Sequence, residues 1–208
     1  MNLGINHLGD PFDFISPGIT FKQYPSCGET HPAIDAILGL MNENRIEPTD
    51  ILSIDCTITP MDWDVLVYHR PQNATEAKFS LEFCVALGIM ERKATLCQFV
   101  DEKVRDPKIL EIMEKVRMES DPALSPDGYT GAATVVSLKL KDGTILTRRV
   151  DQPKGAPENP LTREELLNKF RNCASICLDE SSIERIIDKV MKIEKLNTIK
   201  SLMEELAG

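Results

Sequence analysis

The sequence predicts an α+β fold, with a small antiparallel sheet of about four strands covered by helices and followed by a C-terminal helical segment. Two alternating segments joined by Asp142-Gly143 are typical of a β-hairpin. Upstream of this hairpin, runs with an apolar residue every three to four positions predict amphipathic helices. Downstream of residues 152–160, which hold three prolines and a glycine, every apolar pattern is helical.

The composition supports a globular protein and excludes several partners. The 208 residues are 42% hydrophobic and 27% charged, enough for one substantial core or two small ones. A net charge of -9 opposes the phosphate neutralisation of nucleic-acid binding. No run approaches the roughly 20 apolar residues of a membrane span, and residues 1–10 lack a leader pattern, so we expect a soluble cytoplasmic protein. The six cysteines lack CxxC spacing, which favours reduced thiols over disulfides or zinc.

The first elements follow an irregular start. Residues 1–18 carry Gly, Asn, Asp and Pro without periodicity and predict an irregular lead-in. The alternation over residues 19–24 predicts a short strand. The apolar spacing over residues 29–44 predicts a helix, in which Ser26 and Glu29 are expected to form a capping box.

The central elements are expected from the same two periodicities. Alternating segments predict strands, and three-to-four spacing predicts helices. Asparagine or threonine at the start of the second long helix, and proline at the start of the third, suit first-turn positions. In chain order we expect a strand at 51–59, a helix at 73–90, a helix at 107–115, a strand at 116–119, and the hairpin strands at 134–140 and 144–150.

The proline-rich stretch predicts the domain organisation. We expect an α+β lid domain over residues 19–152 and a C-terminal helical part over residues 153–208. Thr162 and Glu165 predict a capping box at the start of the first C-terminal helix.

A lysine, a tyrosine, a thiol and an imidazole gather around the expected strand-to-helix junction, and these are the candidate site residues. The start of a helix offers unpaired N–H groups and a partial positive charge, so an anion could settle there beside Lys22. His31 is of the type that titrates near neutral pH and suits proton transfer. The alternative is structural, with Lys22 a solvated lysine and His31 a capped first-turn residue. Cys27 and His31 could share a metal, but two ligands alone argue weakly for zinc.

Four motifs in order carry a resemblance to a known family. Residues 22–36 read K-x-Y-P-x-C-x-x-x-H-x-x-I-D-A, and residues 76–80 read E-A-K-F-S. Residues 101–107 read D-E-x-x-x-D-P, and N-P-L-T at 159–162 precedes K-F-R at 169–171. Together they resemble the MmgE/PrpD family, which includes 2-methylcitrate dehydratase.

The resemblance implies a lyase or isomerase acting on small di- or tricarboxylates without a metal or other cofactor. It implies an anion-binding role for Lys22, with Cys27 and His31 as further catalytic residues and with Tyr24 and Ser26 in substrate binding. Some family members have a histidine at the position of Cys27, so the imidazole chemistry of those members is in doubt here. A thiol at this position could act as a nucleophile only if its pKa were depressed, and otherwise shapes the pocket.

The resemblance also implies partners. Family members carry a large N-terminal helical domain that supplies further active-site residues, and this sequence matches only the lid and the C-terminal helices. We therefore expect a separate N-terminal helical-domain chain as a partner, little activity of the chain alone, and a homo-oligomer formed through an exposed apolar face of the C-terminal helices. The alternative is a noncatalytic carboxylate-binding or regulatory remnant.

Overall fold

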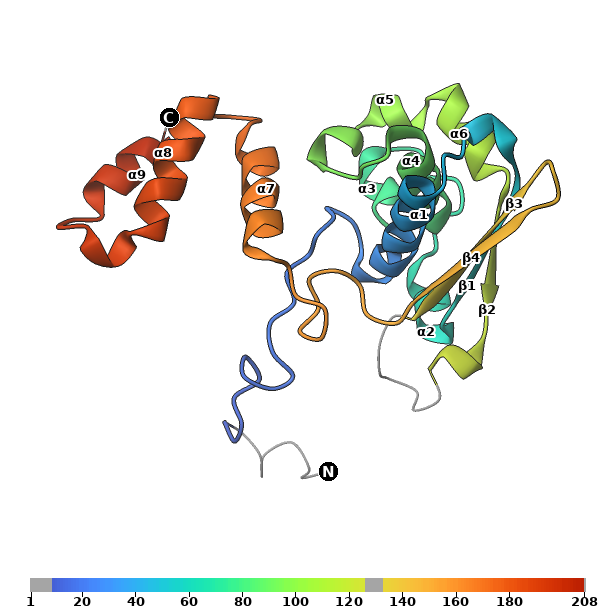
Figure 1. Cartoon of the computed structure of the whole chain (residues 1–208), viewed down its shortest axis with the longest axis horizontal. Helices are drawn as coiled ribbons and strands as arrows, with labels where there is room; N and C mark the ends of the chain where they lie inside the picture. The colour runs from blue at the N-terminus through green and yellow to red at the C-terminus, as the bar shows by residue number, and fades with distance from the viewer. Residues whose placement is uncertain (1–8, 126–132, 208) are drawn as a thin grey trace. The chain divides into compact units, whose positions relative to one another are not determined.

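The computed structural model describes residues 9–125 and 133–207 (Figure 1). Contacts divide the chain into two compact units, residues 1–160 and residues 161–208. Within the described ranges, no helix is long and apolar enough to cross a membrane.

The first unit contains an open four-stranded sheet, which confirms the α+β class and the number of strands. Its order is β2-β1-β3-β4. The antiparallel hairpin and its pairing to β1 are confirmed, whereas β2 runs parallel to β1 and corrects the expectation of a wholly antiparallel sheet. The physical reason is the helical crossover between β1 and β2, which returns the chain to the end where β1 starts. The strands are β1 (Ile51–Ile58), β2 (Val116–Ser120), β3 (Thr134–Leu140) and β4 (Ile145–Val150).

One face of this sheet forms the core. Ile54, Cys56 and Ile58 of β1 are fully buried, as are Val136 and Leu138 of β3. The alternate positions of both strands are more exposed, as expected where helices cover one face only. The longer helices of this first unit lie together on one side of the sheet in Figure 1.

Helices α1 (His31–Glu43) and α4 (Leu81–Glu91) form the centre of the helical layer and pack against each other. Residues 81–89 of α4 are all buried, so this helix is covered on every side rather than along one stripe. A Cβ built on Gly88 would lie 2.9 Å from the Ile37 side chain, so the close approach of the two helices depends on this glycine.

The helix predicted over residues 73–90 is interrupted, and this prediction was wrong at its centre. Helix α3 (Ala74–Ala77) starts at Asn73, whose side chain accepts bonds from two backbone amides, as expected. Ser80 then adopts an extended backbone and its side chain accepts a hydrogen bond from the amide of Phe83, at 3.2 Å. A serine at this position caps a new helix, so α4 begins afresh at Leu81.

The remaining elements of the first unit are short. The helix predicted at 107–115 is present but ends earlier, and the strand predicted at 116–119 is present as β2. These short elements are the 3-10 helices η1 (Gly28–Thr30), η2 (Pro48–Asp50), η3 (Leu96–Gln98) and η4 (Pro122–Leu124), and the α-helices α2 (Pro60–Val65), α5 (Asp101–Val104) and α6 (Pro107–Met113).

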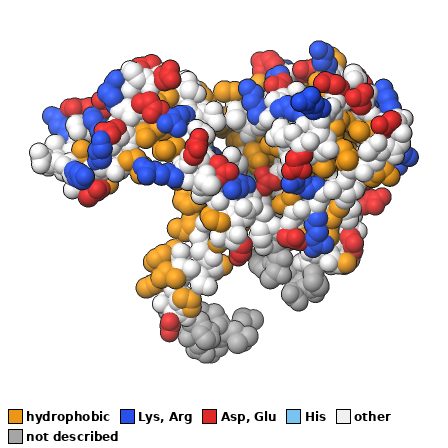
Figure 2. Space-filling model, in the orientation of Figure 1, with side chains coloured by type: hydrophobic (Ala, Val, Ile, Leu, Met, Phe, Trp, Pro, Cys, Tyr) orange, Lys and Arg blue, Asp and Glu red, His pale blue; other side chains and the backbone are white. Residues whose placement is uncertain are grey.

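The strand predicted over residues 19–24 is absent. Alternation produces a strand only where a neighbouring strand can pair with it, and here the amide of Phe21 bonds to the carbonyl of Gly155 in a loop. Ile19 and Phe21 are 59% and 49% exposed, like Phe12 and Phe14 upstream. Figure 2 shows hydrophobic side chains gathered along this segment.

The second unit is helical, as the sequence predicts. It contains α7 (Arg163–Ala174), α8 (Glu180–Met191), the 3-10 helix η5 (Ile193–Lys195) and α9 (Lys200–Ala207). The capping box of Thr162 and Glu165 is confirmed. Arg171 pairs with Glu184 through two hydrogen bonds of 2.6 and 3.1 Å, which join α7 to α8.

Apolar side chains remain exposed on this second unit. Ile183, Ile186 and Leu202 are buried between its helices. Eight other large apolar residues are at least 41% exposed. They are Leu166, Ile176, Val190, Met191, Ile193, Ile199, Met203 and Leu206.

Candidate functional site

Lys22, Tyr24, Ser26 and Cys27 lie in a loop that leads through η1 into α1, and His31 is the first residue of α1. We call this passage from loop to helix the junction. The amide of Cys27 donates to the carbonyl of Lys78 at 2.8 Å, which fixes this junction beside the N-terminal end of α4. The expected capping box of Ser26 and Glu29 is not formed, because the helix starts later than predicted. The Ser26 hydroxyl lies 2.8 Å from the Thr30 hydroxyl instead.

Lys22 places a cation at the junction. Its side chain is exposed, and its Nζ donates to the carbonyl oxygen of Ser26 at 3.2 Å. This bond holds the ammonium at the junction, where its charge acts to lower the pKa values of Cys27 and His31. The ammonium makes no other hydrogen bond or ion pair within the described ranges, so it can accept an anion.

Tyr24 is anchored by the half-buried carboxylate of Asp35. Its hydroxyl donates to Asp35 Oδ1 at 2.5 Å, and Asp35 Oδ2 accepts from the backbone amide of Lys154 at 2.6 Å. Burial raises the pKa of Asp35, while these two donors act in the opposite direction. Asp35 thus ties the loop before α1 to the loop around residue 154 and positions the segment that carries Lys22.

Cys27 carries a protonated thiol at neutral pH. Its Sγ donates to Glu29 Oε2 at 2.6 Å. Burial, followed by the hydrogen bond and charge of Glu29, raises the pKa of this thiol to about 11. Because the thiolate is the reactive form, this environment disfavours a nucleophile and supports the interpretation that Cys27 shapes the site.

His31 is buried and neutral. Its side chain is 2% exposed, and the Tyr24 ring meets it edge-on at a centroid distance of 5.1 Å. Burial lowers the pKa of His31 to about 4, while the nearby backbone of Ser26 and Tyr24 acts in the opposite direction. The expectation of a histidine that titrates near neutrality is therefore wrong, because sequence does not show how deeply the first turn of α1 is buried.

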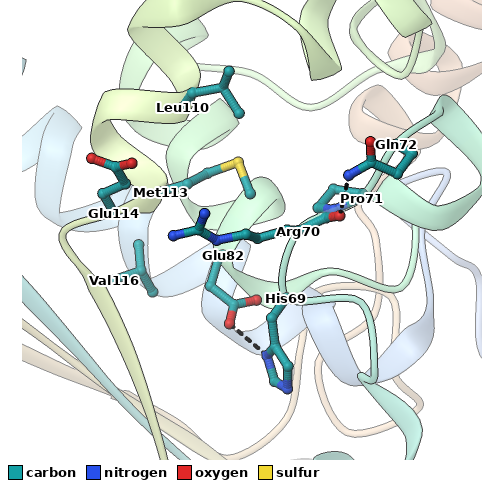
Figure 3. A pocket seen from close by; sticks show the side chains of 9 residues that line it. All are labelled: His69, Arg70, Pro71, Gln72, Glu82, Leu110, Met113, Glu114 and Val116. Carbon is teal, nitrogen blue, oxygen red and sulfur yellow. Dashed lines mark hydrogen bonds and ion pairs between the residues drawn. The ribbon is translucent and has the colours of Figure 1, made fainter.

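A second cluster lies at a pocket that the sequence did not predict. This His69 pocket has a volume of about 390 Å³ (Figure 3). His69 Nδ1 lies 2.8 Å from Glu82 Oε1, and the Ser80 hydroxyl donates to Glu82 Oε2 at 3.4 Å. Glu82 is 8% exposed and belongs to the first turn of α4. The lining residues are His69, Arg70, Pro71, Gln72, Glu82, Leu110, Met113, Glu114 and Val116.

The junction and the His69 pocket adjoin the same end of α4 but share no lining residue. The junction bonds to Lys78, and the pocket contains Glu82, four residues further along the chain. His69 and Glu82 are separated by 13 positions and lie on a loop and a helix, so no periodicity links them. In the sequence, the only signal for this pocket is a single histidine followed by Arg-Pro, at residues 69–71. Within the described ranges, no three His, Cys, Asp or Glu side chains converge as metal ligands.

Comparison with known proteins adds to this geometry. Residues 24–194 match the model of the MmgE/PrpD C-terminal domain. Cis-aconitate decarboxylase of Mus musculus is 29% identical over 197 residues, which cover 91% of this chain and 40% of that protein. Cis-aconitate decarboxylase of Aspergillus terreus is 26% identical over 200 residues, covering 90% of this chain and 40% of that protein.

A third relative carries a different activity in its name. The 2-methylcitrate dehydratase-like protein oryR of Aspergillus oryzae (strain ATCC 42149 / RIB 40) is 24% identical over 204 residues, covering 91% of this chain and 41% of that protein. The chain thus spans about 40% of the length of the curated relatives that it matches.

Proposed function

Because the chain belongs to the MmgE/PrpD family, we propose that it forms the carboxylate-binding part of a lyase or decarboxylase acting on a small tricarboxylate. The observation that carries the proposal is the exposed ammonium of Lys22, held at the junction two residues before the family match begins at residue 24. The names of the relatives support the substrate class, since they refer to cis-aconitate and 2-methylcitrate.

Lys22 would hold a substrate carboxylate and stabilise negative charge. Loss of carbon dioxide, or of a proton beside a carboxylate, leaves an electron pair on carbon. A positioned ammonium lowers the energy of that transition state most where water is excluded. A small polyanion would meet the exposed Lys22 Nζ at this junction.

Tyr24, Ser26, Cys27 and His31 would position this cation rather than move protons. The thiol of Cys27 is protonated and the imidazole of His31 is neutral at pH 7, so neither is poised to exchange a proton with substrate. We infer that the proton-transfer groups come from a helical domain outside these residues, provided by another polypeptide segment. In this organisation residues 19–152 act as a lid, residues 153–208 pack on the helical domain, and the chain alone has little or no turnover.

A noncatalytic carboxylate-binding or regulatory role is the second candidate. It is favoured by the same protonation states, because the junction offers a cation without an acid or base that titrates near neutrality. Such a protein would bind tricarboxylates and would gain no activity from any added domain.

The exposed apolar residues of the second unit support a further part of the proposal. We expect the chain to self-associate through α7, α8 and α9, because burial of exposed apolar side chains is favourable in water. Multi-angle light scattering should give a mass above that of the 23.3 kDa monomer. A strictly monomeric mass over the whole concentration range would contradict self-association.

Calorimetry can test the anion site directly. We expect citrate and cis-aconitate to bind the wild-type chain and to bind Lys22→Ala about tenfold more weakly, as expected for loss of a charge-assisted bond. The matched control is Lys141→Ala, an exposed lysine in the turn after β3 with the same change in charge. Equal weakening in both variants would show a nonspecific charge effect and would reject the site at Lys22.

A further inference from the structure

The His69 pocket contains a cation without a partner. The Arg70 guanidinium makes no hydrogen bond or ion pair with another residue in the described part of the chain. Glu82 lines the same pocket, yet its carboxylate already accepts bonds from the His69 ring and the Ser80 hydroxyl. Figure 3 shows the Glu82 carboxylate directed at His69, while the Arg70 side chain extends toward Met113 and Glu114.

The wall beside this guanidinium is apolar. Leu110, Met113 and Val116 line it, from α6 and the start of β2. Met113 is 7% exposed and Leu110 is 41% exposed, so the wall runs from the core to the surface. The pocket therefore presents a planar cation next to a hydrocarbon surface, within about 390 Å³.

We propose that the His69 pocket binds a short-chain aliphatic monocarboxylate. The guanidinium of Arg70 presents parallel N–H donors that match the two oxygens of a carboxylate. The aliphatic chain of the ligand then lies on Leu110, Met113 and Val116, where its burial is favourable by the hydrophobic effect.

The charges of the lining residues favour a ligand with one carboxylate over a ligand with two or three. Arg70 offers a single free cation, whereas Glu114 is exposed and makes no ion pair within the described residues. A ligand with a second carboxylate would meet the negative charge of Glu114 without a second cation to offset it. This preference differs from that proposed for the junction at Lys22, so the two sites bind different acids.

Methyl NMR of the whole chain tests the proposal with butyrate as the probe. The Met113 methyl signal, identified by its loss in Met113→Leu, reports on the apolar wall. We expect butyrate to shift this signal saturably in the wild type and in Arg117→Gln, a control that removes an exposed arginine of β2 outside the pocket lining. In Arg70→Gln the dissociation constant should rise at least about tenfold.

Other probes test separately the contributions of the ligand's charge and of its aliphatic chain. Butyramide keeps the shape of butyrate without its charge, and inorganic phosphate keeps a charge without the chain, so both should bind at least about tenfold more weakly. Succinate should bind more weakly than butyrate to the wild type, and Glu114→Gln should reduce that difference.

Several outcomes overturn the proposal. They are the absence of saturable butyrate binding, unchanged binding in Arg70→Gln, and phosphate binding as tight as that of butyrate. If Arg70→Gln fails to fold, Arg70→Lys keeps the charge without the planar fork and should still weaken butyrate severalfold. Lys22→Ala should leave butyrate binding unchanged, so this result stands apart from the outcome of the tricarboxylate titration.

Discussion

Acidification should lower the free energy of unfolding of the chain, because the buried His31 is neutral in the folded state and becomes protonated on unfolding. The unfolded chain protonates this histidine near its ordinary pKa of 6.5, whereas the folded chain protonates it only near pH 4. Between these values the unfolded state binds more protons. The contribution of neutral His31 is therefore complete above pH 6.5 and is lost as the pH falls toward 4.

The expected size follows from the two pKa values. A change from 6.5 to about 4 corresponds to about 3 kcal/mol of folding free energy, to be lost over that pH range. The variant His31→Gln has no ring to protonate, so its free energy of unfolding should not show this loss of about 3 kcal/mol between pH 6.5 and 4. Its stability at pH 7 should be lower than that of the wild type because the contact with the Tyr24 ring disappears.

Equilibrium urea unfolding at pH 7.5, 6.5, 5.5 and 4.5 measures the effect. The other titrating groups, including the half-buried Asp35 and the buried Asp62 whose pKa values are raised, are common to both proteins. The difference between wild type and variant therefore isolates His31. Parallel loss of stability in the two proteins would refute the argument that this histidine is buried in its neutral form.

Three further predictions concern the packing around the junction. Asp35→Ala should lower the free energy of unfolding by about 2–3 kcal/mol in urea titrations, because a buried hydroxyl and a backbone amide lose their acceptor. Gly88→Ala should lower the melting temperature, since a Cβ there lies 2.9 Å from Ile37 and overpacking of about 1–3 kcal/mol exceeds the helix propensity gain of about 1 kcal/mol. Cys27 should react with iodoacetamide at pH 8 at least about tenfold more slowly than the exposed Cys97, as followed by peptide mass spectrometry, because its pKa is raised to about 11. Unchanged stability in the first two variants, or equal alkylation of the two thiols, would contradict these arguments.

Local patterns predicted much of the fold. The hairpin followed from Asp142-Gly143 between alternating segments, and the capping box at Thr162 followed from its spacing to Glu165. These features depend on residues close in sequence, which a single chain displays directly. For the same reason, the helix predicted over residues 29–44 is present as α1, over residues 31–43.

Features that depend on distant contacts were not predictable. The strand expected at 19–24 lacks a neighbouring strand, and Ser80 caps a new helix inside a continuous apolar run. The parallel direction of β2 depends on the helical crossover that precedes it.

The candidate site shows the same limit. The family motif predicted Lys22, Cys27 and His31 as candidate site residues, and the structure places all three near the start of α1. Their protonation depends on burial and on Glu29, which no spacing rule reports. The pairing of His69 with Glu82 joins a loop to a helix 13 residues away, and only the folded chain reveals it.

The central claim is that Lys22 holds the carboxylate of a substrate on which the completed enzyme acts. Its most direct test is carbon-13 NMR of cis-aconitate and 2-methylcitrate, each incubated with the chain, with an MmgE/PrpD helical domain, and with their mixture. We expect a product only in the mixture, formed with a kcat/KM at least about tenfold lower when Lys22→Ala replaces the native chain. Equal rates with and without the Lys22 ammonium, or turnover by the helical domain alone at the rate of the mixture, would contradict the claim.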